Sequence, residues 1–142
     1  SAHPKPPVAD EPELFPRSHR VEIDSVLSRA RDDGDPVILV GDFNMSPYYD
    51  EYQTVTAHFV DASRAASENG FDYTFPAGGE LFPFPIVRLD YVFHDDSFRS
   101  IRSGRIRRQT PSDHLPVWAD LVFLGAGAQE REMEKRLEGA RN

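Results

Sequence analysis

Residues 37–44 read Val-Ile-Leu-Val-Gly-Asp-Phe-Asn, an aliphatic run that ends in a glycine and two polar residues around a phenylalanine. A continuous aliphatic run of this length, bounded by turn-forming residues, is typical of a strand buried on both faces of a sheet. Side chains alternate along an extended chain, so Asp42 and Asn44 point the same way while Phe43 points into the core. The segment therefore predicts a buried strand that presents a carboxylate and an amide at its end.

Helices are predicted on both sides of this strand. The spacing i, i+3, i+4 and i+7 of one helical face is met by Ile23, Val26, Leu27 and Ala30. This spacing predicts an amphipathic helix over residues 17–32, ended by the turn-forming run Asp33-Gly34-Asp35-Pro36. Further helices are predicted over residues 47–58 and 61–69, and the alternation of helix and strand indicates an α/β fold.

The second half of the sequence is predicted to be rich in strands. Residues 74–85 contain many prolines and glycines but also large apolar side chains, which indicates a loop anchored to the core. Strands are predicted over residues 87–93, 98–107 and 115–124, with a hairpin turn at Asp95-Asp96-Ser97 between the first two. The expected fold class is α/β, with one mainly antiparallel mixed sheet and flanking helices.

The composition is that of a globular chain long enough for one domain. Of its 142 residues 39% are hydrophobic and 28% charged, and the net charge is -8. This charge argues against a surface built wholly to hold a nucleic-acid backbone, because such affinity comes largely from Lys and Arg. A local basic strip is nevertheless present at Arg99, Arg102, Arg105, Arg107 and Arg108. It is either the solvated face of a hairpin or a phosphate contact.

The two ends of the sequence leave the localisation unknown. Residues 1–7 have neither the cationic region nor the apolar stretch of a signal peptide. No apolar run approaches the roughly 20 residues that a membrane helix needs. We therefore predict no targeting or membrane-spanning segment in this chain. Residues 125–142 are predicted to form a charged tail, as a solvated helix or a frayed end.

Three polar segments lie next to the predicted strands, and side chains at strand ends can converge on one edge of a sheet. They are Gly41-Asp42-Phe43-Asn44, Arg88-Leu89-Asp90-Tyr91 and Ser112-Asp113-His114-Leu115-Pro116-Val117. The chain has no cysteine, so metal ligands must come from His, Asp, Glu or Asn, and oxygen ligands favour a hard cation such as Mg²⁺. Asp113 is such a ligand, and His114 beside it can take a proton near neutral pH.

Each of these features also has a structural interpretation. Asp42 and Asn44 are typical of an Asx turn after a strand. In the functional interpretation, Asp90 could orient His114 by accepting a hydrogen bond from the second ring nitrogen of His114, and His3 offers another proton donor or phosphate-binding group. A single histidine is more often structural or exposed than catalytic. The histidines without such polar neighbours, assigned no function, are His19, His58 and His94.

The order of these motifs resembles the endonuclease/exonuclease/phosphatase superfamily, which includes deoxyribonuclease-I-like enzymes. The resemblance rests on His-Pro, then Gly-Asp-Phe-Asn after an aliphatic run, then Arg-x-Asp-Tyr-x-Phe, then Ser-Asp-His-x-Pro-Val. It implies that residues 1–124 are the C-terminal half of the domain, followed by the tail at residues 125–142. The implied fold is half of a four-layer α/β sandwich.

The resemblance implies an acid–base role for three residues. His3 corresponds to the histidine that contacts the scissile phosphate and serves as general acid. Asp90 would orient His114, which would act as general base or phosphate ligand. The implied reaction is in-line attack of water on a phosphodiester or phosphomonoester.

The resemblance also implies a Mg²⁺ (or Mn²⁺) site. Asp113 would be a metal ligand, and Asp42 and Asn44 would position the attacking water and the phosphate or help hold a second metal. The substrate could be a nucleic acid, a phosphoinositide or a sphingolipid. The apolar loop Leu81-Phe82-Pro83-Phe84-Pro85 could contact a lipid or a base, or close the end of the core.

The family's Asn and Glu metal ligands lie upstream of the position that matches His3, so neither can be assigned here. We therefore expect the 142-residue chain to be an incomplete fragment, inactive or nearly so alone. Its sheet would expose an apolar face, to be covered by the missing N-terminal half of the domain or by self-association. The alternative function is a non-catalytic binding or assembly module that uses this open sheet face.

Overall fold

The computed structural model describes residues 14–32, 34–66, 72–78, 83–107 and 111–125. The helices are α1 (Leu14–Asp32), α2 (Asp50–Thr56) and α3 (Ala62–Ala66). The strands are β1 (Ile38–Asp42), β2 (Val60–Asp61), β3 (Asp90–His94), β4 (Phe98–Arg105) and β5 (Val117–Phe123). Within these residues the fold is a mixed α/β arrangement with two antiparallel sheets, one ordered β1-β3-β2 and the other made of β4 and β5.

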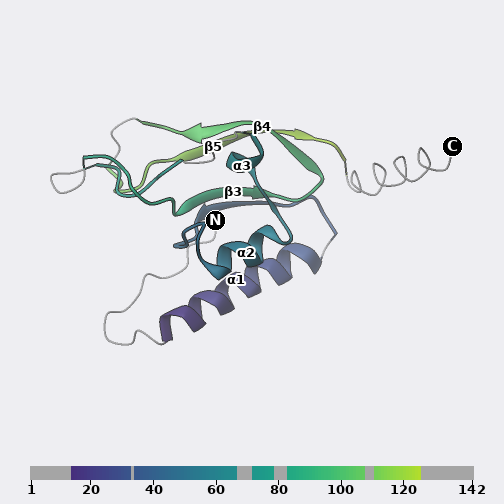
Figure 1. Ribbon diagram of the computed structural model, residues 1–142. Coiled ribbons are helices and arrows are strands. Elements are labelled where there is room, and N and C mark those ends of the chain that lie inside the picture. The colour runs from purple at the N-terminus through teal and green to yellow at the C-terminus, as the bar shows by residue number, and fades with distance from the viewer. Residues whose placement is uncertain (1–13, 33, 67–71, 79–82, 108–110, 126–142) are drawn as a thin grey trace.

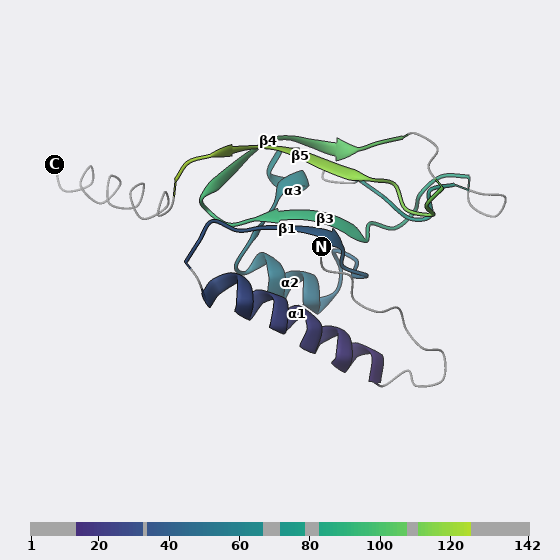
Figure 2. The ribbon, with the colours of Figure 1, turned by 180° about the vertical axis from the view of Figure 1, so that it is seen from behind.

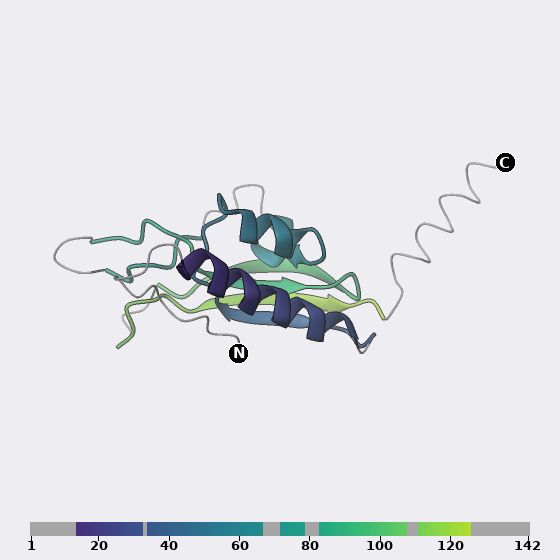
Figure 3. The same cartoon turned by 90° about the horizontal axis from the view of Figure 1, so that it is seen from below.

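The elements are arranged in layers (Figure 1). Helices α1 and α2 lie on one side of the three-stranded sheet, and the β4–β5 sheet lies on the other side with α3 beside it, as the reverse view also shows (Figure 2). Seen from below, α1 runs across the helical side of the molecule (Figure 3). None of the helices in the described chain combines the length and apolarity that a membrane span requires.

The main core lies between the helices and the three-stranded sheet. Its buried members are Ile23, Leu27, Phe43, Met45, Tyr52, Val55, Phe59, Tyr91 and Phe93. The aromatic rings interlock, with Phe43 edge-on to Phe93 at 5.2 Å between ring centroids. The predicted apolar helical face is confirmed, because Ile23 and Leu27 are buried on α1.

The predicted elements are present with shifted ends. The helix predicted over residues 17–32 is α1, and that predicted over residues 47–58 is the shorter α2. The strand predicted over residues 115–124 is β5. Part of the helix predicted over residues 61–69 is α3, and residues 67–71 lie outside the described chain, as do the N-terminal segment and the tail from residue 126.

The predictions of a single sheet and of a hairpin across residues 95–97 are wrong. β3 pairs with β1 and β2, whereas β4 pairs with β5. The Asp95 carboxylate accepts the backbone N–H of Ser97 and, at 2.9 Å, that of Val37 just before β1. The turn is thus tied to β1, and the chain passes from one sheet to the other instead of folding back.

The prediction that residues 37–40 are buried on both faces is also wrong for the described chain. Leu39 packs against the core, but Ile38 and Val40 on the opposite face are 43% and 45% exposed. The reason is that the described residues cover the far face of β1 only in part. An aliphatic run predicts that both faces of a strand are covered, but it does not show which part of the protein covers each face.

A buried ion pair joins β2 to the segment before β3. The guanidinium of Arg88 donates two hydrogen bonds to Asp61, Nη1 to Oδ2 at 2.8 Å and Nη2 to Oδ1 at 2.7 Å. Both residues are less than 5% exposed, and Tyr52 on α2 donates its hydroxyl to the same carboxylate at 2.8 Å. Burial, reinforced by Asp61, raises the pKa of Tyr52 above its usual range, so the phenol remains a donor.

We predict that Asp61→Ala lowers the free energy of unfolding by about 3–5 kcal/mol, because the substitution leaves the Arg88 charge buried without its carboxylate. Urea unfolding of the 142-residue chain measures the change. Asp50→Ala is the matched control, since the Asp50 carboxylate is exposed in a 3.8 Å ion pair with Arg20 and its loss should cost less than about 1 kcal/mol. Equal losses in the two variants would contradict the prediction.

Candidate active site

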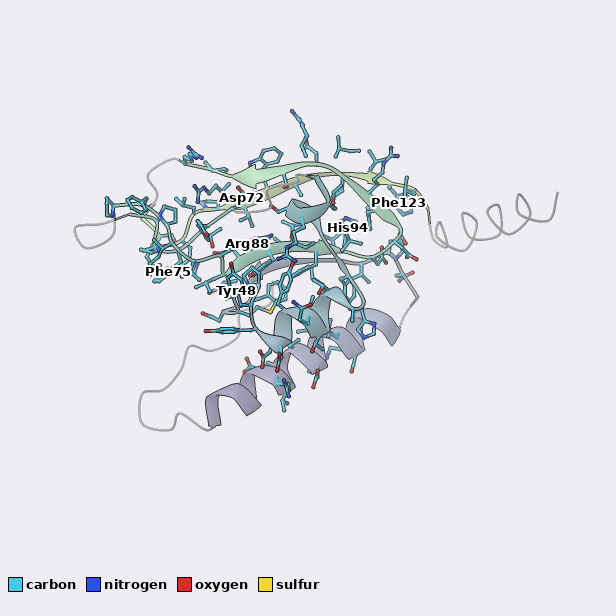
Figure 4. All side chains as sticks on the ribbon, in the orientation of Figure 1. Tyr48, Asp72, Phe75, Arg88, His94 and Phe123 are labelled. Carbon is cyan, nitrogen blue, oxygen red and sulfur yellow. The ribbon has the colours of Figure 1, made fainter. Side chains whose placement is uncertain are left out.

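A cleft of about 610 Å³ opens where β1 ends and β3 begins. The residues that line it are Asp42, Asn44, Phe75, Leu89, Asp90, Ser112, Asp113 and His114. Figure 4 shows Phe75 at this end of the molecule, and His94 and Phe123 toward the opposite end. The three polar segments singled out in the sequence therefore reach one cleft.

The end of β1 is shaped by an Asx turn. The backbone N–H of Asn44 donates to Oδ1 of Asp42 at 2.8 Å, and Asn44 has a positive φ of 49°. Asparagine is among the few residues that adopt this left-handed conformation readily. Phe43 is buried as predicted, and its N–H donates to the carbonyl of Leu89 at 2.9 Å. The structural interpretation of this triplet is thus correct, and the same turn holds both polar side chains at the cleft.

Asp90 and His114 form a hydrogen-bonded pair at the cleft. Nδ1 of His114 lies 2.8 Å from Oδ2 of Asp90. A carboxylate only accepts, so Nδ1 carries the proton and the other ring nitrogen, Nε2, is the acceptor in the neutral ring. The Phe75 ring packs on the imidazole at 4.9 Å between centroids, and Ser112 accepts the backbone N–H of His114. The pair has the arrangement of a base held in one orientation by a carboxylate.

Two carboxylates face each other across β1 and β3 at the cleft. Asp42 is the direct antiparallel partner of Asp90, and like charges in directly opposite positions repel. Asp42, Asp90 and His114 each offer a ligand atom, and these atoms lie within 4.8 Å of one another. Carboxylate and imidazole ligands fit a divalent cation, which would offset the repulsion. These three residues are a candidate metal site, whose metal the geometry does not identify.

This group differs from the predicted ligand set of Asp113, Asp42 and Asn44. Asp113 lines the same cleft but is exposed, and its backbone carbonyl accepts the N–H of Ala77 at 2.6 Å. Asp42 belongs to both sets. The two assignments therefore differ in whether Asp113 or the Asp90–His114 pair completes the site.

The histidines predicted to have no function lie away from the cleft where they are described. His94 is 1% exposed, and its ring nitrogens lie 2.6 Å from the carbonyl of Asp95 and 2.7 Å from the hydroxyl of Ser100, which links β3 to β4. His58 is exposed at the end of α2. The predicted site residue His3 lies outside the described residues, as does the side chain of His19.

Two arginines of the basic strip contact other parts of the chain. Arg102 donates to Asp120 on β5 and lies over the Trp118 ring, and Arg105 donates to the carbonyl of Tyr73. Arg102 is exposed, which favours a solvated hairpin face for this arginine, whereas Arg105 is partly buried. Arg108 lies outside the described residues, as do Leu81 and Phe82 of the apolar loop. Phe84 of that loop is 65% exposed and does not close the core.

Sequence reasoning missed the residues that support the site. Tyr91 donates its hydroxyl to the carbonyls of Met45 and Arg88, at 2.8 and 3.0 Å, and so ties the loop after β1 to the start of β3. Burial raises the pKa of Tyr91 above its usual range, which keeps this donor protonated. The motif Arg-x-Asp-Tyr contained the signal, because a tyrosine and an arginine beside an aliphatic strand need buried partners.

The fold and the cleft together define a class: an α/β chain that gathers carboxylates, an amide and an oriented histidine at one end of a sheet. The profile of the Endonuclease/Exonuclease/phosphatase family matches residues 3–114. The chain therefore belongs to the endonuclease/exonuclease/phosphatase family, whose members are metal-dependent phosphoester hydrolases. None of the curated proteins compared with the chain matches it significantly.

Solved structures that resemble this chain share its fold. A Bacteroides vulgatus endonuclease/exonuclease/phosphatase is 22% identical with a TM-score of 0.64, over 75% of this chain and 44% of that one. For the Bacteroides thetaiotaomicron mannosyl-6-phosphatase the identity is 24% and the TM-score 0.61, over 75% and 46%. The Beutenbergia cavernae protein is 23% identical with a TM-score of 0.62, over 80% and 33%. The chain thus spans less than half the length of these relatives and is a partial domain.

We predict that Mn²⁺, as a paramagnetic probe, selectively broadens the amide resonances of residues around Asp42 when added to the 142-residue chain. Asp42→Asn removes the carboxylate shared by both candidate ligand sets. It should weaken Mn²⁺ binding at least about tenfold, because this is the smallest loss of metal affinity typical even for a residue that only supports a metal ligand. Asp120→Asn, in an exposed ion pair on β5, is the control. Broadening that is uniform, or unchanged in Asp42→Asn, would contradict a metal site here.

Proposed function

We propose that this chain supplies the acid–base and phosphate-positioning part of a Mg²⁺-dependent phosphoesterase (Mn²⁺ being the alternative metal). The observation that carries the proposal is the convergence of Asp42, Asn44, Asp113 and the Asp90–His114 pair on one cleft. Family membership supports phosphoester hydrolysis as the reaction class. The cleft is large enough for a phosphoryl group and part of its alcohol.

The Asp90–His114 pair is proposed to provide the base. With its Nδ1 proton held by Asp90, His114 presents Nε2 to a water or a phosphate oxygen. Asp42 and Asn44 would hold the attacking water and a phosphoryl oxygen in line with the leaving group. His3 is proposed as the general acid that protonates the leaving alcohol.

The metal is proposed to lie between Asp42 and Asp113, with Asn44 as a further oxygen ligand. Asp90 and His114 are already paired at 2.8 Å, and this assignment leaves the pair to act as the base. When bound, Mg²⁺ would neutralise charge that develops on the phosphoryl oxygens. Asp113→Asn should then weaken Mn²⁺ binding more than Asp90→Asn does.

The active form is proposed to need more than this chain. Mg²⁺ is poorly held by few carboxylates, because it demands near-octahedral geometry. The family relationship supports a half of a four-layer α/β sandwich whose remaining half supplies an Asn and a Glu. The exposed Ile38 and Val40 on β1 fit a face that this half, or a second copy of the chain, would cover. The substrate is proposed to be a phosphoester of a nucleic acid, a phosphoinositide or a sphingolipid.

A second candidate function is a non-catalytic binding or assembly module. The same exposed face of β1 favours it, since an apolar strand face can bind a partner without any chemistry in the cleft. The two candidates differ in whether the cleft residues matter to the activity of the longer protein.

We predict that the 142-residue chain alone hydrolyses phosphoesters at a rate near background, and that a longer form containing an upstream half is active with Mg²⁺. The substrates are DNA, a phosphoinositide, sphingomyelin and bis-p-nitrophenyl phosphate, with mannose 6-phosphate added because one relative is a mannosyl-6-phosphatase. His114→Ala in the longer form should lower kcat by about 10²–10⁴-fold, the typical contribution of an acid or base.

The matched control is His58→Ala, which removes an exposed histidine outside the cleft and should leave kcat unchanged. Full activity of the 142-residue chain would reject the proposal that it is incomplete. An unchanged rate in His114→Ala would reject the proposed mechanism and favour the binding module.

A further inference from the structure

Thr74 is a fully buried polar residue that lies outside every motif recognised in the sequence. Its exposed fraction is 0%. A buried hydroxyl in a mainly apolar setting is costly unless it is hydrogen-bonded, so its partners indicate what it does.

The Thr74 hydroxyl accepts hydrogen bonds from two successive backbone donors. They are the N–H of Leu89 at 3.1 Å and the N–H of Asp90 at 3.3 Å. Leu89 and Asp90 lead into β3, at the point where the chain enters the cleft. The hydroxyl therefore takes the place of a backbone acceptor and holds the backbone from which the Asp90 side chain projects.

The backbone of Thr74 also binds the segment that carries His114, the other partner of the Asp90–His114 pair. Its carbonyl accepts the N–H of Leu115, next to His114, at 2.8 Å. Its own N–H donates to the carbonyl of Val87 at 2.8 Å, on the side of Asp90. One residue thus holds both segments, although Asp90 and His114 are 24 positions apart in sequence.

We propose that Thr74 is a positioning residue that sets the spacing of the Asp90–His114 pair; its importance for catalysis rests on the proposed function. The side chain must be short, must accept two hydrogen bonds and must fit an extended segment, which threonine and serine do. Valine has the shape of threonine but leaves both N–H groups without an acceptor. Cysteine has nearly the same size, and its sulfur is only a weak acceptor.

The test reads the ring proton of His114 directly, in the 142-residue chain without substrate or metal. Proton NMR at low temperature detects the Nδ1–H that is hydrogen-bonded to Asp90, assigned by its loss in His114→Asn. Its exchange with water is measured in the wild type and in Thr74→Ser, Thr74→Cys and Thr74→Val. Thr54→Val is the matched control, because the Thr54 hydroxyl donates to the carbonyl of Asp50 in an exposed hydrogen bond within α2.

We expect the exchange rate of the His114 ring proton to lie within about twofold of the wild-type rate in Thr74→Ser and Thr54→Val. The rate should be at least tenfold faster in Thr74→Val, which corresponds to about 1.4 kcal/mol. The rate in Thr74→Cys should be intermediate. If Thr74→Val does not fold, the comparison of Ser with Cys decides. A wild-type exchange rate in both Thr74→Cys and Thr74→Val would overturn the proposal, even if these variants melt at lower temperature. If Thr74→Val does not fold, a wild-type rate in Thr74→Cys alone would overturn it. So would the absence of the ring proton from the wild type. The result stands whether or not the longer protein hydrolyses phosphoesters, because neither substrate nor turnover enters the measurement.

Discussion

The buried ion pair between Arg88 and Asp61 is the interaction on which the rest of the structure depends. It joins β2 to the segment that leads into β3, and Tyr52 adds the helical layer to the same carboxylate. Such a pair contributes little net stability compared with a well-packed apolar core, but breaking it leaves a buried charge and is very costly. Its geometric effect is to fix where β3 begins, two residues after Arg88, and therefore where Asp90 lies.

The cleft follows from that starting point. Antiparallel pairing brings Asp42 opposite Asp90, and Tyr91 holds the loop after β1 through the carbonyl of Met45. Thr74 then joins the β3 side to the segment that carries His114. Three segments far apart in the sequence are thereby positioned by buried hydrogen bonds. The carboxylates and the imidazole gain defined places because these hydrogen bonds hold the backbone beneath them.

Much of this could be predicted from the sequence, because the relevant signals are local. The helical spacing of Ile23 and Leu27 identified α1, and period-two alternation placed Phe43 in the core with its polar neighbours at the strand end. The errors concern partners. The turn at residues 95–97 was recognised, but whether β4 folds back on β3 or crosses to β5 depends on Asp95 reaching Val37, 58 positions away. No short window of sequence contains that contact.

The sequence by itself determined the chemistry of the chain: which residues offer carboxylates, an amide and an imidazole, in an order specific to one family. It also determined most elements, since periodicity and turn residues act over a few positions. The sequence suggested that Asp90 orients His114, and the tertiary structure shows the contact. The tertiary structure alone decided that Thr74 supports both segments and that the described residues cover one face of β1 only in part. These features depend on which buried donors find which acceptors across the fold, and on what covers a sheet face, and both are properties of the packed chain as a whole.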